Sequence, residues 1–379
     1  MSEDFLPYSR QWIEDEDVEA VVEALRSAII SQGLRLEEFE KAFASKTDAA
    51  FAIGVSSGTA ALHTMCSVAN LGPGDEVILP ALTFASSANA ILYTGATPVF
   101  VDIDPATLCM DANLTQAAVT TRTKAIVAVD FAGHPAPYHE LREIADRAGL
   151  LLLADSAHSA GGLYNDRPVG SIADLTAFSF NPVKNMTSAE GGMVTTNNPD
   201  FAKRARMFRT HGMTREPELL ESDSPGSWYF EQQFLGFNYK LSELHAALGM
   251  AQLTRLDRFN RRRSELAAAY IDRLSDVSLE LPSFTENGLH TWHLFVVRVK
   301  NAMDRARIFG ALRESGFGVQ VHYIPVPMHP HFRRLGYSMH GLPVTADYYE
   351  RAISLPLHPR MTAEDLGRVV TALRDQLGA

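Results

Sequence analysis

Cysteine and long hydrophobic runs are both scarce in this sequence. Among 379 residues there are only two cysteines, Cys66 and Cys109. They are too few for a zinc site of cysteines alone or for a disulfide framework, which fits a reducing cytosol. No apolar run approaches the roughly 18 residues of a membrane-spanning helix, and the N-terminus MSEDFLPYSR has no cationic stretch followed by an apolar one. The sequence therefore predicts a cytoplasmic protein with no membrane partner.

Positive charge is scarce as well. The chain has 34 Lys and Arg against 45 Asp and Glu, a formal net charge of −11, and no Lys/Arg-rich arm offers the phosphate neutralisation that nucleic-acid binding requires. Neither GxGxxG nor a P-loop motif occurs. His322, His329 and His331 have no Cys or carboxylate in the same run, so we expect no metal. These absences exclude nucleic acid as a partner and favour a small molecule.

The first two-thirds of the chain alternates short apolar runs with helical stretches, a pattern typical of an α/β fold with a mostly parallel sheet flanked by helices. Several runs are hydrophobic throughout, which indicates strands buried on both faces. The seven predicted strands are residues 50–55, 76–81, 97–103, 124–131, 149–155, 175–180 and 191–196.

The last third predicts a smaller α+β domain, giving a division into residues 1–250 and 251–379. A long loop over 215–230 is followed by one helical pattern over 242–275, within which the arginines at 261–263 are interpreted as a solvated face. Loops of that length often cover a site in compact enzymes. Strands are then predicted over 292–299 and 318–324, and helices over 306–316 and 363–377.

Three interpretations compete for Gly54-Val55-Ser56-Ser57-Gly58, which lies between a predicted strand and a predicted helix. It matches the GxSxG of a serine hydrolase, but the available acid and histidine, Asp155 and His158, lie three residues apart, which makes a relay to Ser56 difficult to build. The same turn can bind a phosphate at the helix N-terminus near Thr59. It can also be a strand-to-helix turn with a simple N-cap.

Three further residues follow the ends of predicted strands. Phe84 follows the second, Asp155 ends the fifth, and Lys184 lies just past the sixth. Doubly wound sheets bind ligands at this edge, and a buried carboxylate or lysine there is costly unless it has a partner. Together with the anion-binding turn, these residues match what pyridoxal phosphate requires: a phosphate anchor, a stacking surface, an acid for the ring nitrogen and an amine for the aldehyde.

The chain resembles the DegT/DnrJ/EryC1/StrS family of sugar aminotransferases, a fold-type I pyridoxal-phosphate group with a seven-stranded sheet. The resemblance extends over nearly the whole chain. It is carried by SSGTAALH (56–63), GDEVILPALTFASSANAI (74–91), ADSAHSAGG (154–162), FSFNPVKNMTSAEGG (178–192), GFNYKLSELHAALGMAQL (236–253) and VHYIP (321–325).

The resemblance assigns roles to individual positions. Lys184 matches the lysine that holds the cofactor and moves the proton, and Asp155 the acid at its ring nitrogen. Phe84 matches the stacking aromatic and His158 the side chain beside the phenolic oxygen. The implied phosphate contacts are Gly58, Thr59, Ser179 and, from a neighbouring subunit, Asn238, so a homodimer with shared active sites is expected.

The substrate contacts are expected at Lys240, His322 and Tyr323. Asn181 and Lys240 stand where many members have His and Arg, so the chain departs from the family pattern near the substrate. Members that dehydrate sugars carry His in place of the lysine, so Lys184 favours transamination. The implied reaction transfers the amino group of L-glutamate to a nucleotide-linked 4-keto sugar.

Two subgroups are similar to this chain. ADSAHSAGG, FRTHGM and GVQVHYIPV resemble the pseudaminic acid enzyme, which acts on a UDP-4-keto-6-deoxy N-acetylated hexose. FLPYSR and SLPLHPRMTAEDLGRVVTAL resemble enzymes that make UDP-4-amino-4-deoxy-arabinose. The first is favoured.

Overall fold

The computed structural model describes residues 5–283 and 288–378. At its centre is a seven-stranded sheet of order β2-β10-β9-β6-β5-β3-β4, in which β10 runs antiparallel to the other six strands. All seven predicted runs form these strands, with slightly shifted ends. In sheet order they are β2 (Phe51–Val55), β10 (Gly192–Thr196), β9 (Leu175–Ser179), β6 (Leu151–Asp155), β5 (Thr123–Val129), β3 (Glu76–Pro80) and β4 (Thr97–Val101).

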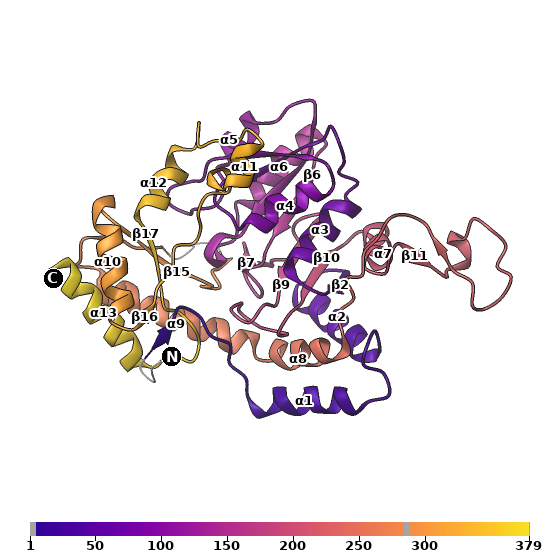
Figure 1. Ribbon diagram of the computed structural model, residues 1–379, viewed down its shortest axis with the longest axis horizontal. Coiled ribbons are helices and arrows are strands. Elements are labelled where there is room, and N and C mark those ends of the chain that lie inside the picture. The colour runs from indigo at the N-terminus through magenta and orange to yellow at the C-terminus, as the bar shows by residue number, and fades with distance from the viewer. Residues whose placement is uncertain (1–4, 284–287, 379) are drawn as a thin grey trace.

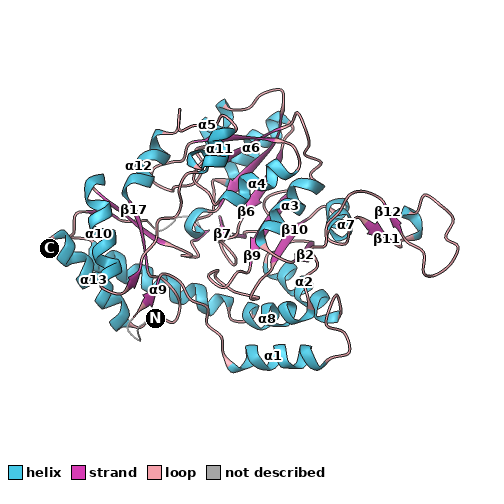
Figure 2. Cartoon of the chain, in the orientation of Figure 1, coloured by secondary structure: helices cyan, strands magenta, loops and turns pink. Residues whose placement is uncertain are grey.

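Helices cover both faces of this sheet (Figures 1 and 2). Because successive strand residues point to opposite faces, Leu153 packs into one hydrophobic cluster and its neighbours Leu152 and Ala154 into the other. One face carries α3 (Gly58–Val68), α4 (Ala85–Tyr93) and α7 (Pro199–Phe208); the other carries α2 (Leu34–Lys46), α5 (Ala112–Ala117), α6 (Tyr138–Ala148) and α8 (Glu243–Leu253).

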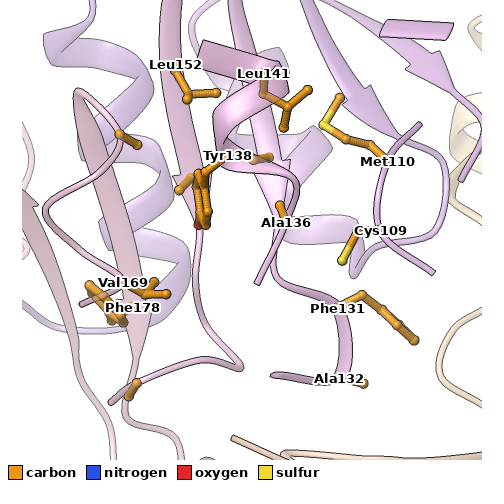
Figure 3. Close-up of a cluster of buried hydrophobic side chains, with 14 of the residues drawn as sticks. Cys109, Met110, Phe131, Ala132, Ala136, Tyr138, Leu141, Leu152, Val169 and Phe178 are labelled. Atoms are coloured by element: carbon orange, nitrogen blue, oxygen red, sulfur yellow. The ribbon is translucent and has the colours of Figure 1, made fainter. Parts of the chain in front are cut away.

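Figure 3 shows part of the second cluster, where Tyr138 and Leu141 of α6 pack beside Leu152 of β6. All three side chains are buried to 1% exposure or less. At about 1.5–3 kcal/mol for each large apolar side chain removed from water, such a cluster fixes the helix layer on the sheet. The strand ends that carry polar residues are thereby held in place.

A second, three-stranded antiparallel sheet of order β13-β15-β17 lies in the C-terminal part. It packs with its helices around a third hydrophobic cluster, which also includes Leu6. The division at residues 250 and 251 stays a prediction. The elements of this part are α9 (Leu256–Leu274), β13 (Leu279–Glu280), β15 (Phe295–Val299), α10 (Ala302–Glu314), β16 (Phe317–Gly318), α12 (Pro343–Arg351), β17 (Ala352–Leu355) and α13 (Ala363–Leu377).

The remaining elements complete the described chain. They are β1 (Leu6–Pro7), α1 (Asp15–Arg26), β7 (Leu163–Tyr164), β8 (Arg167–Pro168), β11 (Met213–Thr214), β12 (Glu231–Gln232), β14 (Gly288–Leu289), α11 (Pro330–Arg334) and the 3-10 turns Phe131–Gly133, Pro217–Leu219 and Val326–Met328. In residues 5–283 and 288–378, no helix has both the length and the apolarity needed to cross a membrane.

Three sequence predictions are wrong in detail. The helical pattern over 242–275 is two helices, which separate at Thr254 and Arg255. In the predicted strand 318–324 only Gly318 belongs to a strand, β16, and Gln320 forms an isolated bridge with Ser354. The arginine run is not wholly solvated, because Arg263 is only 1% exposed although Arg261 faces solvent.

The predicted loop over 215–230 belongs to an arm that extends away from the body, between β11 and β12 (Figures 1 and 2). The carboxylate of Glu231 organises it by accepting hydrogen bonds from the backbone N–H of Glu221 at 2.6 Å and of Ser222 at 3.0 Å, and from the hydroxyl of Tyr229 at 2.9 Å. Trp228 is 69% exposed. In a single chain this arm therefore does not cover the end of the sheet.

The N-terminal segment links separate parts of the molecule. Leu6 pairs with Phe317 in a short parallel ladder between β1 and β16. Two residues later the carbonyl oxygen of Tyr8 accepts a 2.9 Å hydrogen bond from the N–H of Leu357. The hydroxyl of Ser9 then donates to the carbonyl oxygen of Val183 at 2.9 Å.

A second link runs from the large sheet to α12. Asp102 follows β4 and is 2% exposed. Its carboxylate accepts 2.8 Å hydrogen bonds from the N–H groups of Val344 and Thr345, in the first turn of α12, and a 2.6 Å bond from the Thr345 hydroxyl. These N–H groups have no partner within the helix, so Asp102 fixes the position of α12 against the sheet.

Candidate active site

The turn between β2 and α3 has the form of an anion cradle. Ser57 caps α3 by accepting a 3.1 Å hydrogen bond from the N–H of Ala60. Gly58 packs so closely on Ser179, at the end of β9, that a Cβ added to it would lie 2.6 Å from the Ser179 Cβ. Only glycine permits this approach, and it places the Ser179 side chain beside the free N–H groups of the first helical turn, where Thr59 is exposed.

Asp155 lies at the end of β6 and is 6% exposed. Its carboxylate accepts hydrogen bonds from the Ser87 hydroxyl at 2.6 Å and from the N–H of Ala157 at 3.2 Å. Burial raises the pKa of Asp155, and these hydrogen bonds and the charge of Lys184 act against that rise. The geometry thus provides one buried carboxylate directed at the same region as the lysine.

Lys184 follows β9 in a tight turn, in which its N–H donates to the carbonyl oxygen of Asn181 at 2.9 Å. Desolvation lowers the pKa of its ammonium to about 8, against the opposing attraction of Asp155. A buried lysine with a lowered pKa is the form of lysine that acts as a nucleophile and proton carrier.

Aromatic rings form one wall of the site. Phe84 is 57% exposed, and its ring centroid lies 5.6 Å from that of Tyr323. The Tyr323 hydroxyl in turn lies 3.1 Å from Nε2 of His158. The site therefore includes the exposed face of Phe84, on which a flat ring can stack.

His158 is buried between this wall and a second histidine. His293 stacks on it with ring centroids 4.2 Å apart. Burial together with the positive charge of Lys184 lowers the pKa of His158 well below its usual value, so the ring is neutral at pH 7. Its Nδ1 has no hydrogen-bond partner in the described chain, and it is therefore available to a ligand.

Asp130 was not identified from the sequence, although it lies just past β5 as Asp155 lies at the end of β6. Its carboxylate accepts hydrogen bonds from the hydroxyls of Tyr138, Ser156 and Ser159 and from the N–H of Ala136. The two serines flank the loop that carries His158. The sequence signal that could have identified Asp130 is an acidic residue directly after an apolar strand. No such signal in the sequence marks His293.

Three of the predicted site residues, Asn238, Lys240 and His322, remain to be placed. Asn238 is exposed and makes no side-chain hydrogen bond within the described residues, and Lys240, two residues on, pairs with Val55 beside the anion cradle. His322 is 9% exposed, and its Nδ1 lies 2.8 Å from the Ser354 hydroxyl, so it packs behind Tyr323. The other predicted residues surround Lys184 or the cradle.

No serine-hydrolase relay is present in the described chain. The backbone N–H of Ser56 donates to the carbonyl oxygen of Tyr239 at 2.9 Å. Asp155 bonds Ser87 instead of His158, and Nε2 of His158 faces the hydroxyl of Tyr323. The acid-histidine-serine chain that this mechanism needs is therefore not assembled.

Pyridoxal phosphate fits the donor set of this site. The group has an aldehyde, a ring nitrogen, a phenolic oxygen and a phosphate, and the site offers a lysine amine, a buried carboxylate, the unpartnered Nδ1 of His158 and the cradle at Gly58. Each has the chemistry to complement one group of the cofactor. The fit accounts for a half-buried, desolvated lysine and a buried orphan nitrogen that would otherwise be costly.

Similar proteins support the same identification. The family model described as the DegT/DnrJ/EryC1/StrS aminotransferase family matches residues 11–374. The spore coat polysaccharide biosynthesis protein SpsC of Bacillus subtilis is 42% identical over 377 residues, which cover 98% of this chain and 97% of SpsC.

Two solved structures have nearly the same fold. The putative sugar aminotransferase Spr1654 of Streptococcus pneumoniae, solved in a PMP form, is 30% identical with a TM-score of 0.93, and the match covers 99% of this chain and 98% of that one. PseC of Helicobacter pylori, an aminotransferase involved in the biosynthesis of pseudoaminic acid, is 28% identical with a TM-score of 0.92 over 99% and 100% of the two chains.

Proposed function

The chain belongs to the DegT/DnrJ/EryC1/StrS aminotransferase family, and from this premise we propose the substrates of a reaction whose class is known. It is a pyridoxal-phosphate-dependent sugar aminotransferase. We propose that it takes the amino group of L-glutamate and transfers it to C4 of a UDP-linked 4-keto-6-deoxy-N-acetylhexosamine.

The observation that supports the aminotransfer chemistry is the environment of Lys184. With its pKa lowered to about 8, about 9% of the side chain is the free amine at pH 7, against about 0.03% for a lysine with its ordinary value of 10.5. When bound, pyridoxal phosphate supplies an electron sink for the negative charge that develops at the α-carbon. The free amine is the group that can hold the cofactor through its aldehyde.

Each of the other residues would hold one part of the cofactor. Asp155 would pair with the ring nitrogen and keep it protonated, and Phe84 would stack on the ring. His158 would contact the phenolic oxygen. The phosphate would lie at Gly58, Thr59 and Ser179, where the positive end of α3 favours an anion.

Lys184 also carries the protons of the reaction. Its Nζ, once released by the amino donor, is the group positioned to remove the proton from the donor's α-carbon. In the reverse direction the same atom delivers a proton to C4 of the sugar. A lysine with a pKa of about 8 can do both, because a useful fraction of each protonation state is present near neutral pH.

The sugar is proposed from the relatives and from the loop after β16. PseC acts in pseudoaminic acid biosynthesis and SpsC in that of a spore coat polysaccharide. Tyr323, proposed as a sugar contact with His322 and Lys240, lies between Phe84 and His158. The alternative is a UDP-4-keto-pentose, as in the formation of 4-amino-4-deoxy-arabinose.

We further propose a cytoplasmic homodimer whose subunits share their active sites. An apolar groove runs from α1 to the turn before Lys184, lined by Ile13, Val18, Val22, Pro182 and Leu248, and Val18 is 52% exposed. Such a surface is typical of a subunit interface. Sedimentation should therefore give twice the 41.7 kDa of one chain, and an active monomer would contradict the proposal.

The test is a panel of UDP-keto-sugars. The purified protein should absorb at about 400–430 nm, lose that band with L-glutamate, and convert the 6-deoxy-N-acetylhexosamine in preference to the pentose, as read by mass spectrometry of the products. Lys184→Ala should lose the band. Exclusive conversion of the pentose would select the alternative, and absence of the band in the wild-type protein would contradict the assignment of Lys184.

A further inference from the structure

The carboxylate of Asp155 stands at the end of a buried chain of hydroxyl groups. Its Oδ2 accepts a 2.6 Å hydrogen bond from the hydroxyl of Ser87, and the Oγ of Ser87 lies 2.7 Å from the Oγ1 of Thr83. Ser87 is 1% exposed and Thr83 is 2% exposed. The cofactor contacts proposed for this site include neither hydroxyl, and burying a polar group is costly unless it is hydrogen-bonded.

The direction of this chain follows from the number of hydrogens. A serine hydroxyl has a single hydrogen to donate, and two acceptors lie near that of Ser87. The carbonyl oxygen of Phe84 is 3.2 Å away, whereas the Asp155 carboxylate is 2.6 Å away. The shorter bond, to the charged acceptor, is the stronger of the two. Because the hydrogen of Ser87 is then used, Thr83 donates to Ser87, and Ser87 donates to Asp155.

The other oxygen of Asp155 is held less firmly. Its Oδ1 accepts a hydrogen bond from the N–H of Ala157 at 3.2 Å, which is the long end of the usual range. Burial raises the pKa of Asp155, and the hydrogen bond from Ser87 is the largest of the effects that oppose this rise. Ser87 therefore influences both the orientation of the carboxylate and its negative charge.

The position of Ser87 is fixed by the helix that carries it. Ser87 lies in the first turn of α4, which begins directly after Phe84. Ala88 and Ile91 of this helix are fully buried in a hydrophobic cluster with the strands of the large sheet. One turn of chain thus carries both the exposed ring of Phe84 and the hydroxyl that holds Asp155.

We propose that Ser87 is a positioning residue for the cofactor, whose hydroxyl orients the Asp155 carboxylate toward the ring nitrogen and keeps it a hydrogen-bond acceptor. This inference rests on the role proposed for Asp155. A carboxylate that accepts complements a ring nitrogen that carries a proton. A protonated Asp155 would donate instead and complement a neutral ring nitrogen, so the hydroxyl of Ser87 favours the first arrangement over the second.

The test compares two ligands on the apo-protein. Pyridoxal phosphate has the ring nitrogen, and 1-deazapyridoxal phosphate has a C–H group in its place. Ser87→Ala removes the hydroxyl that holds Asp155. Ser86→Ala is the matched control, because Ser86 is the half-buried neighbour on the same turn and its side chain makes no hydrogen bond within the described chain. Asp155→Asn removes the charge itself.

For Ser87→Ala we expect the dissociation constant of pyridoxal phosphate to rise about tenfold, the lower end of what a hydrogen bond to a charged group is worth. The dissociation constant of the 1-deaza ligand should stay within about twofold, because that ligand has no ring nitrogen to pair with Asp155. Ser86→Ala should leave both values within about twofold of the wild type. The absorbance change on titration gives both constants and needs no turnover.

Equal weakening of both ligands by Ser87→Ala would overturn the proposal, since it would show a disturbance of α4 or of Phe84. Unchanged affinity for both ligands would overturn it as well. Asp155→Asn should reduce the preference for pyridoxal phosphate at least as much as Ser87→Ala does, because Ser87 acts through Asp155. If Asp155→Asn leaves that preference unchanged, the role proposed for Asp155 is wrong. If Asp155→Asn reduces it and Ser87→Ala does not, the role of Ser87 alone is wrong.

Discussion

Gly58→Ala perturbs the anion cradle without changing any charge. The added Cβ would lie 2.6 Å from the Cβ of Ser179, whereas ordinary contacts begin at 3.4 Å, so the start of α3 and the end of β9 must part by about 0.8 Å. A shift of that size takes the N–H groups of the first helical turn out of hydrogen-bond range of a bound phosphate. The cost in stability should be about 1–3 kcal/mol from overpacking, reduced by up to about 1 kcal/mol of gained helix propensity.

The assay compares two ligands on the apo-protein. Pyridoxal phosphate carries the phosphate and pyridoxal does not, so only the first should be affected. Loss of one or two hydrogen bonds to a charged group, each about 1.5–3 kcal/mol, should weaken pyridoxal phosphate binding by about ten- to a hundredfold or more and leave pyridoxal within about twofold. Gly72→Ala is the control, because a Cβ there meets nothing within 4 Å.

Equal weakening of both ligands by Gly58→Ala would refute the reasoning. It would mean that the substitution disturbs Lys184 or the ring site, not the phosphate. An unchanged affinity for pyridoxal phosphate would likewise place the phosphate away from this turn.

Two further predictions follow from buried groups. Since only the free amine of Lys184 reacts with an aldehyde, its pKa of about 8 predicts that the rate of pyridoxal phosphate capture rises with pH, is half-maximal at about pH 8 and then levels off. Stopped-flow absorbance would measure this, and a rate still rising near pH 10 would show that burial does not lower the pKa. Asp102→Ala leaves Val344 and Thr345 without their acceptor and should lower the free energy of unfolding by about 2–4 kcal/mol. The exposed cap Asp111→Ala, which loses one acceptor for Leu114, should cost about 1 kcal/mol in the same denaturant titration, and equal losses would contradict the role of Asp102.

The sheet could be predicted from the sequence because its signals are local. Each strand is a short apolar run that ends at a turn, and Asp155 was found because a carboxylate directly follows such a run. Lys184 required a different argument, since many lysines follow strands. Its identification came from its combination with the turn at Gly58 and with Phe84.

The errors arose where contacts between distant residues determine the structure. The break between α8 and α9 has no glycine or proline at Thr254 or Arg255, and Arg255 is instead held by ion pairs with Glu14 and Asp17. Arg263 follows two arginines and looks solvated, yet the carbonyl groups that surround it come from residues 29 to 94 positions away. The periodicity of a helical sequence does not indicate which distant residues will contact the helix.

The path of residues 5–10 has a mechanical consequence. One short stretch of chain hydrogen-bonds β16 through Leu6, the segment before α13 through Tyr8, and the turn of Lys184 through Ser9. A rotation of the C-terminal part must therefore pull on that turn or break the bond from Ser9 to Val183. The turn of Lys184 is thus connected to the C-terminal part through a few consecutive residues. A movement of that part on substrate binding would therefore shift the turn that carries the amine.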